Sequence, residues 1–257
     1  MYFKYLLNAI LRFPFLPLLY VQGKQIRKRV PNLPEASGDK DSYIPKKQTA
    51  RKQHILFLGE STMAGVGVRT HEEGFAGSFA KEIGKLLAKN IHWKVYAKSG
   101  ATATYVTKKI VPKIKESKTD FIVVALGAND AFRLNTPWQW KKDVRELIEV
   151  LKAKFPSTNI LFCNMPPIKD FPAFTPLIKK IVGNHIEFLG IEVKNIARLE
   201  ERVFYFDEHI TLENWSTKFK IPSNKEAFFS DGIHPSKLTY QIWAKDLATK
   251  SIETKIF

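Results

Sequence analysis

The sequence predicts one α/β domain with a mainly parallel sheet, preceded by an apolar and basic N-terminal segment. Five short apolar runs alternate with longer segments whose apolar residues recur at helical spacing. Such alternation is typical of a parallel sheet covered by helices on both faces. With 257 residues and 44% hydrophobic content, the chain can build a globular domain with a substantial core.

The predicted strands comprise residues 55–58, 93–97, 121–126, 159–163 and 203–206. The predicted helices cover about residues 75–87, 105–114, 137–151, 177–199 and 237–247. Thr136 and Ser236 are placed to cap two of these helices, while Thr70 and Glu73 form a capping-box pattern. Residues 208–230 are expected to be a long loop.

The net charge of +16 favours an anionic partner, and half of that excess lies in residues 1–52. Eleven Lys or Arg residues stand there against three acidic residues. The sequence has no zinc-ligand spacing, no RNA-binding aromatic signature and no clear helix-turn-helix pattern, so nucleic acid is not an expected partner. The single cysteine, Cys163, lies in an apolar run and is expected to be buried.

Residues 1–30 are predicted to associate with an anionic membrane surface. A cleavable signal peptide and a straight spanning helix fit poorly, because Arg12 interrupts the apolar run and Pro14 and Pro17 break a helix. An interfacial amphipathic segment fits better, with an arm packed on the protein's own surface as the alternative. The basic flank predicts a domain on the cytoplasmic side, peripheral or monotopic, or anchored by this uncleaved segment.

Residues 31–53 combine several prolines with many charges and few large apolar side chains. That composition is typical of a linker or an extended segment lying on the surface. We therefore expect an extended linker over residues 31–53 and the globular domain over residues 54–257.

Three strand ends and one turn carry groups suited to nucleophilic catalysis. Ser61, Gly100 and Asn129 each follow a predicted strand, and Asp231 and His234 precede the last helix. Carboxyl ends of parallel strands meet at one edge of a sheet, so these residues are expected to converge. His234 suits the base that a serine nucleophile needs, and Asp231 suits the carboxylate that orients the base. The backbone amides of Ser61 and Gly100, with the Asn129 side chain, suit an oxyanion hole.

Each residue also has an ordinary structural use. Ser61 suits a helix cap, Gly100 and Asn129 suit strand-end turns, and Asp231 suits a turn. A lone histidine such as His234 is commonly a surface or capping residue. The occurrence of all these features, in order, at the strand ends of one α/β pattern favours catalysis.

Together these residues resemble the motifs of the SGNH hydrolases, also called the GDSL esterase/lipase family. The matching blocks, within about residues 54–250, are Gly59-Glu60-Ser61, Gly100, Gly127-Ala128-Asn129-Asp130 and Asp231-Gly232-Ile233-His234. The resemblance implies a three-layer α/β/α, flavodoxin-like sandwich with a five-stranded, mainly parallel sheet. It also implies Ser61 as nucleophile, His234 as general base and then acid, and Asp231 as the orienting carboxylate. Glu60 stands where the family usually has Asp, which predicts altered hydrogen bonding beside the nucleophile.

The resemblance further implies a serine esterase or lipase that needs neither a metal nor an organic cofactor. Phe171 and Phe174 are candidates for lining an acyl pocket, with ordinary loop packing as the alternative. With the apolar arm, they indicate lipid-like or short acyl esters, such as lysophospholipids, as substrates. A carbohydrate O-acetyl esterase and a non-catalytic membrane-bound adaptor are the alternative functions.

Overall fold

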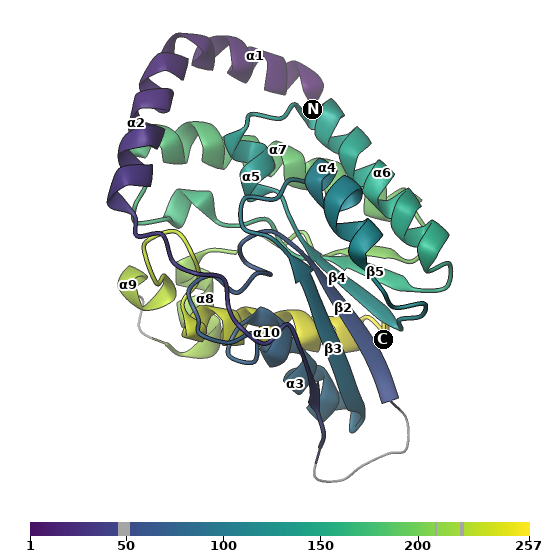
Figure 1. Cartoon of the computed structure of the whole chain (residues 1–257). Helices are drawn as coiled ribbons and strands as arrows, with labels where there is room; N and C mark the ends of the chain where they lie inside the picture. The colour runs from purple at the N-terminus through teal and green to yellow at the C-terminus, as the bar shows by residue number, and fades with distance from the viewer. Residues whose placement is uncertain (46–51, 209, 222–223) are drawn as a thin grey trace.

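The computed structural model describes residues 1–45, 52–208, 210–221 and 224–257. Its strands are β1 (Lys40–Tyr43), β2 (Lys52–Gly59), β3 (Asn90–Ala97), β4 (Phe121–Ala125), β5 (Asn159–Phe162) and β6 (Val203–Tyr205). They form one sheet in the order β1-β3-β2-β4-β5-β6 (Figure 1). Only the β1–β3 pair is antiparallel among these neighbours. The α/β class and the mainly parallel sheet are confirmed, but the sheet has six strands where five were expected.

The additional strand, β1, comes from the segment expected to be an extended linker. It pairs with β3 from Lys40 opposite Lys94 to Tyr43 opposite Ile91. Tyr43 packs closely on α3 (Phe75–Leu87), because a Cβ atom at Gly84 would lie 2.3 Å from its ring. A short polar edge strand of this kind has no apolar alternation that would distinguish it from a linker.

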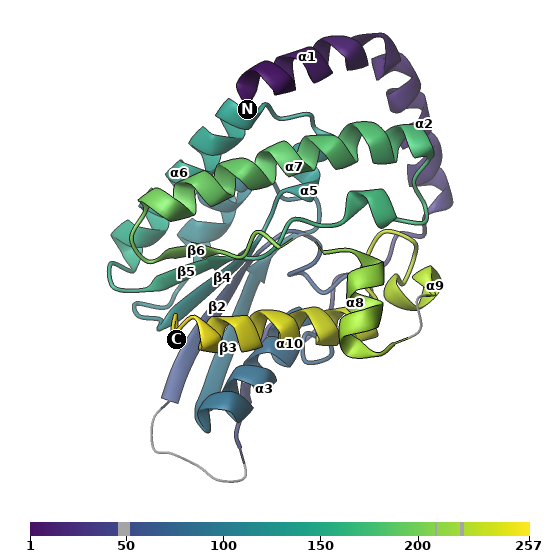
Figure 2. The same cartoon turned by 180° about the vertical axis from the view of Figure 1, so that it is seen from behind.

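Helices cover both faces of the sheet and make three layers (Figures 1 and 2). α3 and α10 (Lys237–Glu253) pack together on one face, while α6 (Pro137–Lys154) and α7 (Pro176–Leu199) pack together on the other. Between them, the central strands β2 and β4 are buried over most of their apolar length. This burial on both faces explains why their sequences are continuous apolar runs.

Two of the expected helix caps are confirmed. The hydroxyls of Thr136 and Ser236 each accept a backbone hydrogen bond of 3.3 Å at the start of α6 and α10. The capping box at Thr70 and Glu73 is wrong, because α3 begins only at Phe75 and has Gly74 as its N-cap. Thr70 instead accepts a 3.4 Å hydrogen bond from the Glu73 amide in the preceding turn.

The segment 208–230 is not simply a long loop, because it contains α8 (Leu212–Phe219) and α9 (Lys225–Phe228). The Thr211 hydroxyl caps α8, accepting a 3.1 Å hydrogen bond from the Asn214 amide. Trp215 of α8 is buried in the core of the domain. Leu212 is buried with it, and Phe219 packs against the same core, so apolar residues at positions 212, 215 and 219 hold one face of this short helix on the domain.

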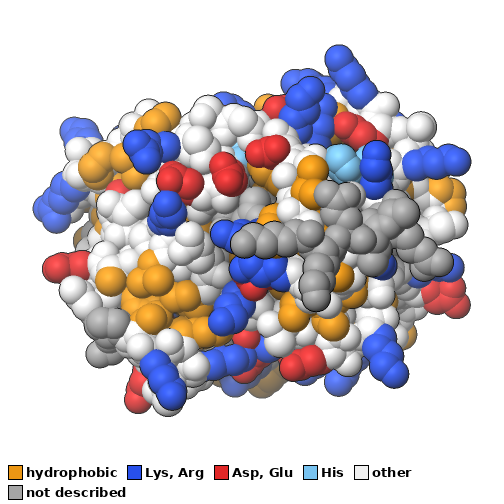
Figure 3. Space-filling view, turned by 90° about the horizontal axis from the view of Figure 1, so that it is seen from below, with side chains coloured by type: hydrophobic (Ala, Val, Ile, Leu, Met, Phe, Trp, Pro, Cys, Tyr) orange, Lys and Arg blue, Asp and Glu red, His pale blue; other side chains and the backbone are white. Residues whose placement is uncertain are grey.

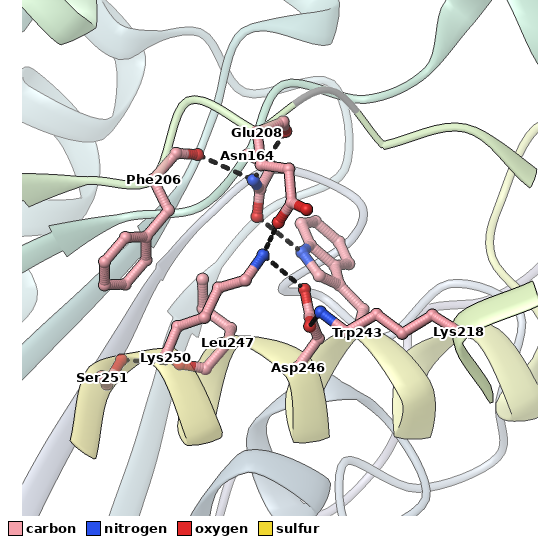
Figure 4. Close-up of polar contacts among 9 residues, drawn as sticks. All are labelled: Asn164, Phe206, Glu208, Lys218, Trp243, Asp246, Leu247, Lys250 and Ser251. Atoms are coloured by element: carbon pink, nitrogen blue, oxygen red, sulfur yellow. Dashed lines mark hydrogen bonds and ion pairs between the residues drawn. The ribbon is translucent and has the colours of Figure 1, made fainter. Parts of the chain in front are cut away.

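Polar contacts join the ends of β5 and β6 to α10 (Figure 4). Asn164 donates to the carbonyl oxygens of Phe206 at 2.7 Å and Glu208 at 3.1 Å, and accepts a 3.3 Å hydrogen bond from the Trp243 indole. On the same helix, Lys250 forms ion pairs with Asp246 and Glu208. These contacts fix the start of the segment that leads to Asp231 and His234.

The N-terminal arm, α1 (Tyr2–Arg12), η1 (Phe13–Phe15) and α2 (Leu16–Arg29), arches over one end of the domain (Figure 1). By length and composition, Tyr2–Arg29 is the one helical stretch in the described residues that could cross a membrane. The helices instead meet at a bend that contains Pro14. Tyr5 is buried, with its ring 5.5 Å from those of both Trp138 and Phe188.

Most of the arm's apolar side chains nevertheless face outward. The exposed ones are Met1, Tyr2, Phe3, Leu6, Leu7, Ile10, Leu11, Phe13, Phe15, Leu18, Tyr20 and Val21. A few residues of the arm thus pack on the domain, as the alternative arrangement expected, while a broad apolar surface stays exposed.

On the face shown in Figure 3, Lys and Arg side chains lie in separate groups with Asp and Glu between them.

The turn after β2 and the segment before α10 fit tightly together at Gly67. A Cβ atom there would lie 2.4 Å from the Pro235 carbonyl oxygen and 2.6 Å from the Ser230 hydroxyl. One residue earlier, the Val66 carbonyl accepts a 2.8 Å hydrogen bond from the buried Tyr240 hydroxyl. These contacts place residues 60–67 against residues 230–235.

Replacing Gly67 with Ala is therefore expected to lower the free energy of unfolding by about 2–4 kcal/mol, because the new Cβ clashes and φ is +105°. Gly38 provides a matched control with a φ of +72° and no neighbouring atom within 4 Å. Gly38→Ala should cost only about 1 kcal/mol. Urea unfolding of both variants measures the difference, and equal losses would contradict the tight fit.

Candidate active site

The predicted site residues follow three adjacent strands of the sheet. Gly100 follows β3, Ser61 follows β2 and Asn129 follows β4, so all three lie at the carboxyl ends of neighbouring strands. Gly59 makes the approach of β2 to β4 feasible, because a Cβ atom there would lie 2.2 Å from the Ala125 carbonyl oxygen. The glycine before the serine turn is thus required by the packing of two strand ends.

Asp231 and His234 lie in contact as a carboxylate–histidine pair, as the sequence predicts. His234 Nδ1 lies 2.7 Å from Asp231 Oδ2, while Asp231 Oδ1 accepts the backbone amides of Ile233 at 2.9 Å and His234 at 2.7 Å. Burial acts to raise the pKa of Asp231, but the hydrogen bonds from His234 and Ile233 outweigh it and hold that pKa below its usual value. An ionised Asp231 fixes the proton on Nδ1 and leaves Nε2 of His234 able to accept a proton.

The Ser61 turn offers an unengaged hydroxyl. In the described part of the chain, neither the Ser61 hydroxyl nor its backbone amide makes a hydrogen bond, and the hydroxyl is not bonded to His234. The turn is closed by a 3.1 Å hydrogen bond from the Val66 amide to the Ser61 carbonyl oxygen. Its contact with Ser230 and Pro235 through Gly67 brings it to the segment that carries His234.

Gly100 likewise presents a free amide. Its φ is +82°, and a Cβ atom at this position would meet nothing within 4 Å. Among the described residues its N–H has no hydrogen-bond acceptor, whereas the Ser99 amide before it donates to Glu35 at 2.7 Å. The backbone amides of Ser61 and Gly100 are therefore both available to an incoming anionic oxygen.

Asn129 is held in place by Glu60. The Glu60 carboxylate is buried and accepts the Ala128 amide at 2.9 Å, the Asn129 amide at 3.0 Å and one N–H of the Asn129 side chain. The other side-chain N–H of Asn129 donates to the Ala101 carbonyl oxygen at 3.1 Å. Because an amide NH₂ has two hydrogens, Asn129 must give up one of these partners before it can donate to an oxyanion.

This finding shows what Glu60 does in place of the family's usual aspartate. The sequence identified the substitution but not its partner, since the partner depends on how close the ends of β2 and β4 lie. Burial raises the pKa of Glu60 to about 7, against the lowering effect of the hydrogen bonds from Asn129 and Ala128. The nearby Asp130 carboxylate raises that pKa further.

Phe171 and Phe174 belong to a packed aromatic cluster, which we define as Phe132, Phe171, Phe174 and Phe229. Successive ring centroids lie 5.2 Å apart from Phe132 to Phe174, 5.3 Å from Phe174 to Phe171 and 5.2 Å from Phe171 to Phe229. Phe171 and Phe174 are only 6% and 7% exposed, whereas Phe132 is 41% exposed. The cluster connects the end of α5 (Ala128–Phe132), which holds Asn129, to the segment that holds His234.

The described residues contain no group of three or more His, Cys, Asp or Glu side chains that could hold a metal ion. Cys163 is buried, as expected, and burial raises the pKa of its thiol well above the usual value. A protonated, buried thiol is a poor nucleophile. The unengaged hydroxyl of Ser61 remains the better candidate.

The state of Glu60 makes the stability of the domain depend on pH. A carboxyl whose pKa is raised by folding binds its proton more tightly in the folded chain, so stability decreases as the pH rises from 4.5 to about 7. At each pH, the free energy of unfolding of Glu60→Gln is subtracted from that of the unmodified chain. This difference should decrease by about 3 kcal/mol as the pH rises over this range. Urea unfolding at several pH values tests this. Glu149→Gln, an exposed change on α6, should follow the unmodified chain. Parallel profiles for Glu60→Gln and the unmodified chain would contradict the raised pKa.

Comparison with known proteins identifies the family of this chain. Residues 55–247 match the family described as GDSL-like Lipase/Acylhydrolase. A GDSL esterase/lipase of Arabidopsis thaliana is 24% identical over 204 residues, which are 72% of this chain and 83% of the plant protein.

Solved structures show the same fold. The crystal structure of TesA superposes with a TM-score of 0.56 at 16% identity, covering 80% of this chain and all of TesA. A family 2 carbohydrate esterase from Corynascus thermopiles (Myceliophthora fergusii) superposes with a TM-score of 0.55 at 15% identity, covering 81% of this chain and 68% of that one. The match over residues 55–247, which contain every motif described above, shows that the chain belongs to the GDSL-like lipase/acylhydrolase family of ester hydrolases.

Proposed function

We propose that the chain cleaves carboxylic esters through an acyl intermediate on Ser61, with His234 as base and then acid. The observation that carries this proposal is the Asp231–His234 pair, joined at 2.7 Å, on a segment packed against the serine turn. In the first step, Nε2 of His234 takes the proton of Ser61 while the Ser61 oxygen attacks the ester carbonyl carbon. His234 then protonates the departing alcohol, and a water that it activates releases the acid.

The free amides of Ser61 and Gly100 support stabilisation of the oxyanion. Neither amide has a partner among the described residues, so both can donate without breaking an existing bond. Asn129 can supply a third hydrogen bond by releasing Glu60 or the Ala101 carbonyl. Glu60 is then a positioning residue, because it sets the orientation of Asn129 without touching the reacting atoms.

Replacing Ser61 with Ala should abolish ester hydrolysis and leave the folding transition in place, because the half-buried hydroxyl makes no hydrogen bond to the described residues. A chromogenic acyl ester measures turnover, and thermal unfolding checks the fold. A serine-directed phosphonate should label Ser61 in the unmodified chain and nothing in the variant.

The control is Ser157→Ala, which removes an exposed serine from the turn before β5. It should keep full turnover and full labelling. An unmodified chain that neither turns over an ester nor reacts with the phosphonate would indicate the non-catalytic adaptor. Full turnover by Ser61→Ala would instead remove the serine mechanism.

We propose that the substrates are lipid-like acyl esters, including lysophospholipids, met at an anionic membrane surface on the cytoplasmic side. The exposed apolar residues of the arm support this, as do the four basic residues in the second half of α2. Tyr5 holds α1 on the domain, so an arm lying on the membrane would bring the domain to the same surface. Activity confined to an acetylated sugar would favour the carbohydrate O-acetyl esterase instead.

Changing Ile10, Leu11 and Phe13 together to Ser should lower binding to vesicles at least about tenfold, because these exposed side chains would lose their burial in lipid. Co-sedimentation with vesicles of phosphatidylglycerol and phosphatidylcholine measures the loss. Leu199→Ser, which changes an equally exposed side chain at the end of α7, should bind like the unmodified chain. Equal binding by all three proteins would contradict the proposed membrane surface.

A further inference from the structure

An open cavity of about 550 Å³ lies beside the candidate active site. Thr102 and Asp130 line it. They follow Ala101 and Asn129 in the chain, and these two residues are joined by a hydrogen bond. The cavity therefore shares its wall with the turns that carry Gly100 and Asn129. Its volume is within the range of small-molecule sites in proteins.

Three cationic side chains line this cavity. Lys108 and Lys109 come from η2 (Val106–Ile110), and Arg133 comes from the residue after α5. All three are exposed, and Lys108 and Lys109 form no ion pair with another residue that the structure describes. Burial raises the pKa of the nearby Asp130 carboxylate, and the charge of Arg133 helps to lower it. The two lysines can therefore bind an anion from solution, and Arg133 adds a third positive charge to the same wall.

Two acidic side chains also line the cavity, but their oxygens already have partners. Asn135 Nδ2 donates to Asp130 at 3.2 Å and to Asp143 at 3.0 Å. The second oxygen of Asp130 accepts the Ala103 amide at 3.1 Å, and the second oxygen of Asp143 accepts the Gln139 side chain at 2.8 Å. The carboxylates thus belong to a hydrogen-bonded wall, whereas Lys108 and Lys109 have no ion-pair partner in the described part of the chain.

Exposed apolar side chains lie in the segments that line this cavity, and one of them touches the N-terminal arm. Tyr105 lines the cavity, and Phe132, Leu134 and Trp138 are exposed in the segment around Arg133 and Asn135. The Trp138 ring lies 6.3 Å from that of Tyr2 in α1. A ligand that combines a negative charge with an acyl chain matches this combination of surfaces.

We propose that this cavity binds the phosphate group of a single-chain phospholipid whose acyl ester is presented to Ser61. The proposal rests on the proposed function and names its substrate more closely. Phosphate is favoured over an uncharged sugar because three cations line the cavity against two carboxylates, and Lys and Arg form charge-assisted hydrogen bonds with phosphate oxygens. The reaction remains the hydrolysis of the acyl ester, with the phosphate as a binding group only.

The test compares two substrates with the same acyl chain, a 1-acylglycerol 3-phosphate and the corresponding 1-acylglycerol. The quantity measured is the ratio of their kcat/KM values. The unmodified chain should prefer the phosphate ester, and Lys108→Ala/Lys109→Ala should lower that ratio at least about tenfold, mainly through KM. Arg133→Ala should act in the same direction.

A control removes the same charge elsewhere. Lys81→Ala/Lys245→Ala changes two exposed lysines on α3 and α10, on the opposite face of the sheet, and should leave the ratio unchanged. An equal fall in both double variants would overturn the proposal, because a general charge effect would then explain the preference. An unmodified chain that hydrolyses both esters equally would overturn it while leaving the esterase function intact.

A binding measurement separates this proposal from the proposed function. Calorimetry of Ser61→Ala with glycerol 3-phosphate should show binding that Lys108→Ala/Lys109→Ala removes, whether or not any ester is hydrolysed. Absence of binding to Ser61→Ala would overturn the proposal. Inorganic phosphate distinguishes the source of the anion: it should compete weakly with the phosphate ester. Competition as strong as that of the ester itself would indicate a site for free phosphate and overturn the lipid assignment.

Discussion

The buried carboxylate of Glu60 is the interaction on which the geometry of the site depends. It accepts the backbone amides of Ala128 and Asn129 and one N–H of the Asn129 side chain, so it ties the turn after β2 to the turn after β4. Burial disfavours the charged form of Glu60, and three donors from one turn offset part of that cost. The same contacts that make the burial tolerable therefore fix Asn129. The side chain of an aspartate at position 60 would be one methylene shorter and would end farther from the same donors. Glutamate in place of the family's usual aspartate therefore changes how Asn129 is held.

The remaining elements act by bringing the last segment of the chain to this pair of turns. Gly67 lets the serine turn touch Pro235 and Ser230, and Tyr240 holds that turn from α10. Farther along, the aromatic cluster joins the end of α5 to Phe229. The close backbone contact at Gly67 tolerates little displacement of the two segments. The aromatic rings bury apolar surface but allow small shifts between the segments that carry them. The position of His234 thus depends on both kinds of contact.

Much of the fold and of the candidate site could be predicted from the sequence. Buried parallel strands have continuous apolar sequences, and the polar residues of the site follow their ends. Ser61, Gly100 and Asn129 were identifiable for that reason, and Asp231 with His234 because the pair lies within one turn. The partner of Glu60 could not be predicted, since it depends on the separation of two strand ends. The edge strand β1 is polar and has no periodic signal, whereas α8 has one that spans only two turns and is easily read as part of a loop. The cationic cavity was missed because its residues come from separate segments. Only the adjacent Lys108 and Lys109 gave a local sign of it.

The arm and the cavity are parts of one contiguous structure. Tyr5 lies with its ring 5.8 Å from that of His185, whose Nε2 lies 2.9 Å from the Asn135 carbonyl oxygen. A carbonyl can only accept, so Nε2 carries the hydrogen, and burial lowers the pKa of His185 to about 4, which keeps the ring neutral near pH 7. The Asn135 side chain in turn bridges Asp130 and Asp143 in the cavity wall. Ring packing and hydrogen bonds thus link the seat of α1 to the cavity wall. The packing of the arm on the domain therefore affects the same wall that carries Asp130 and Asp143.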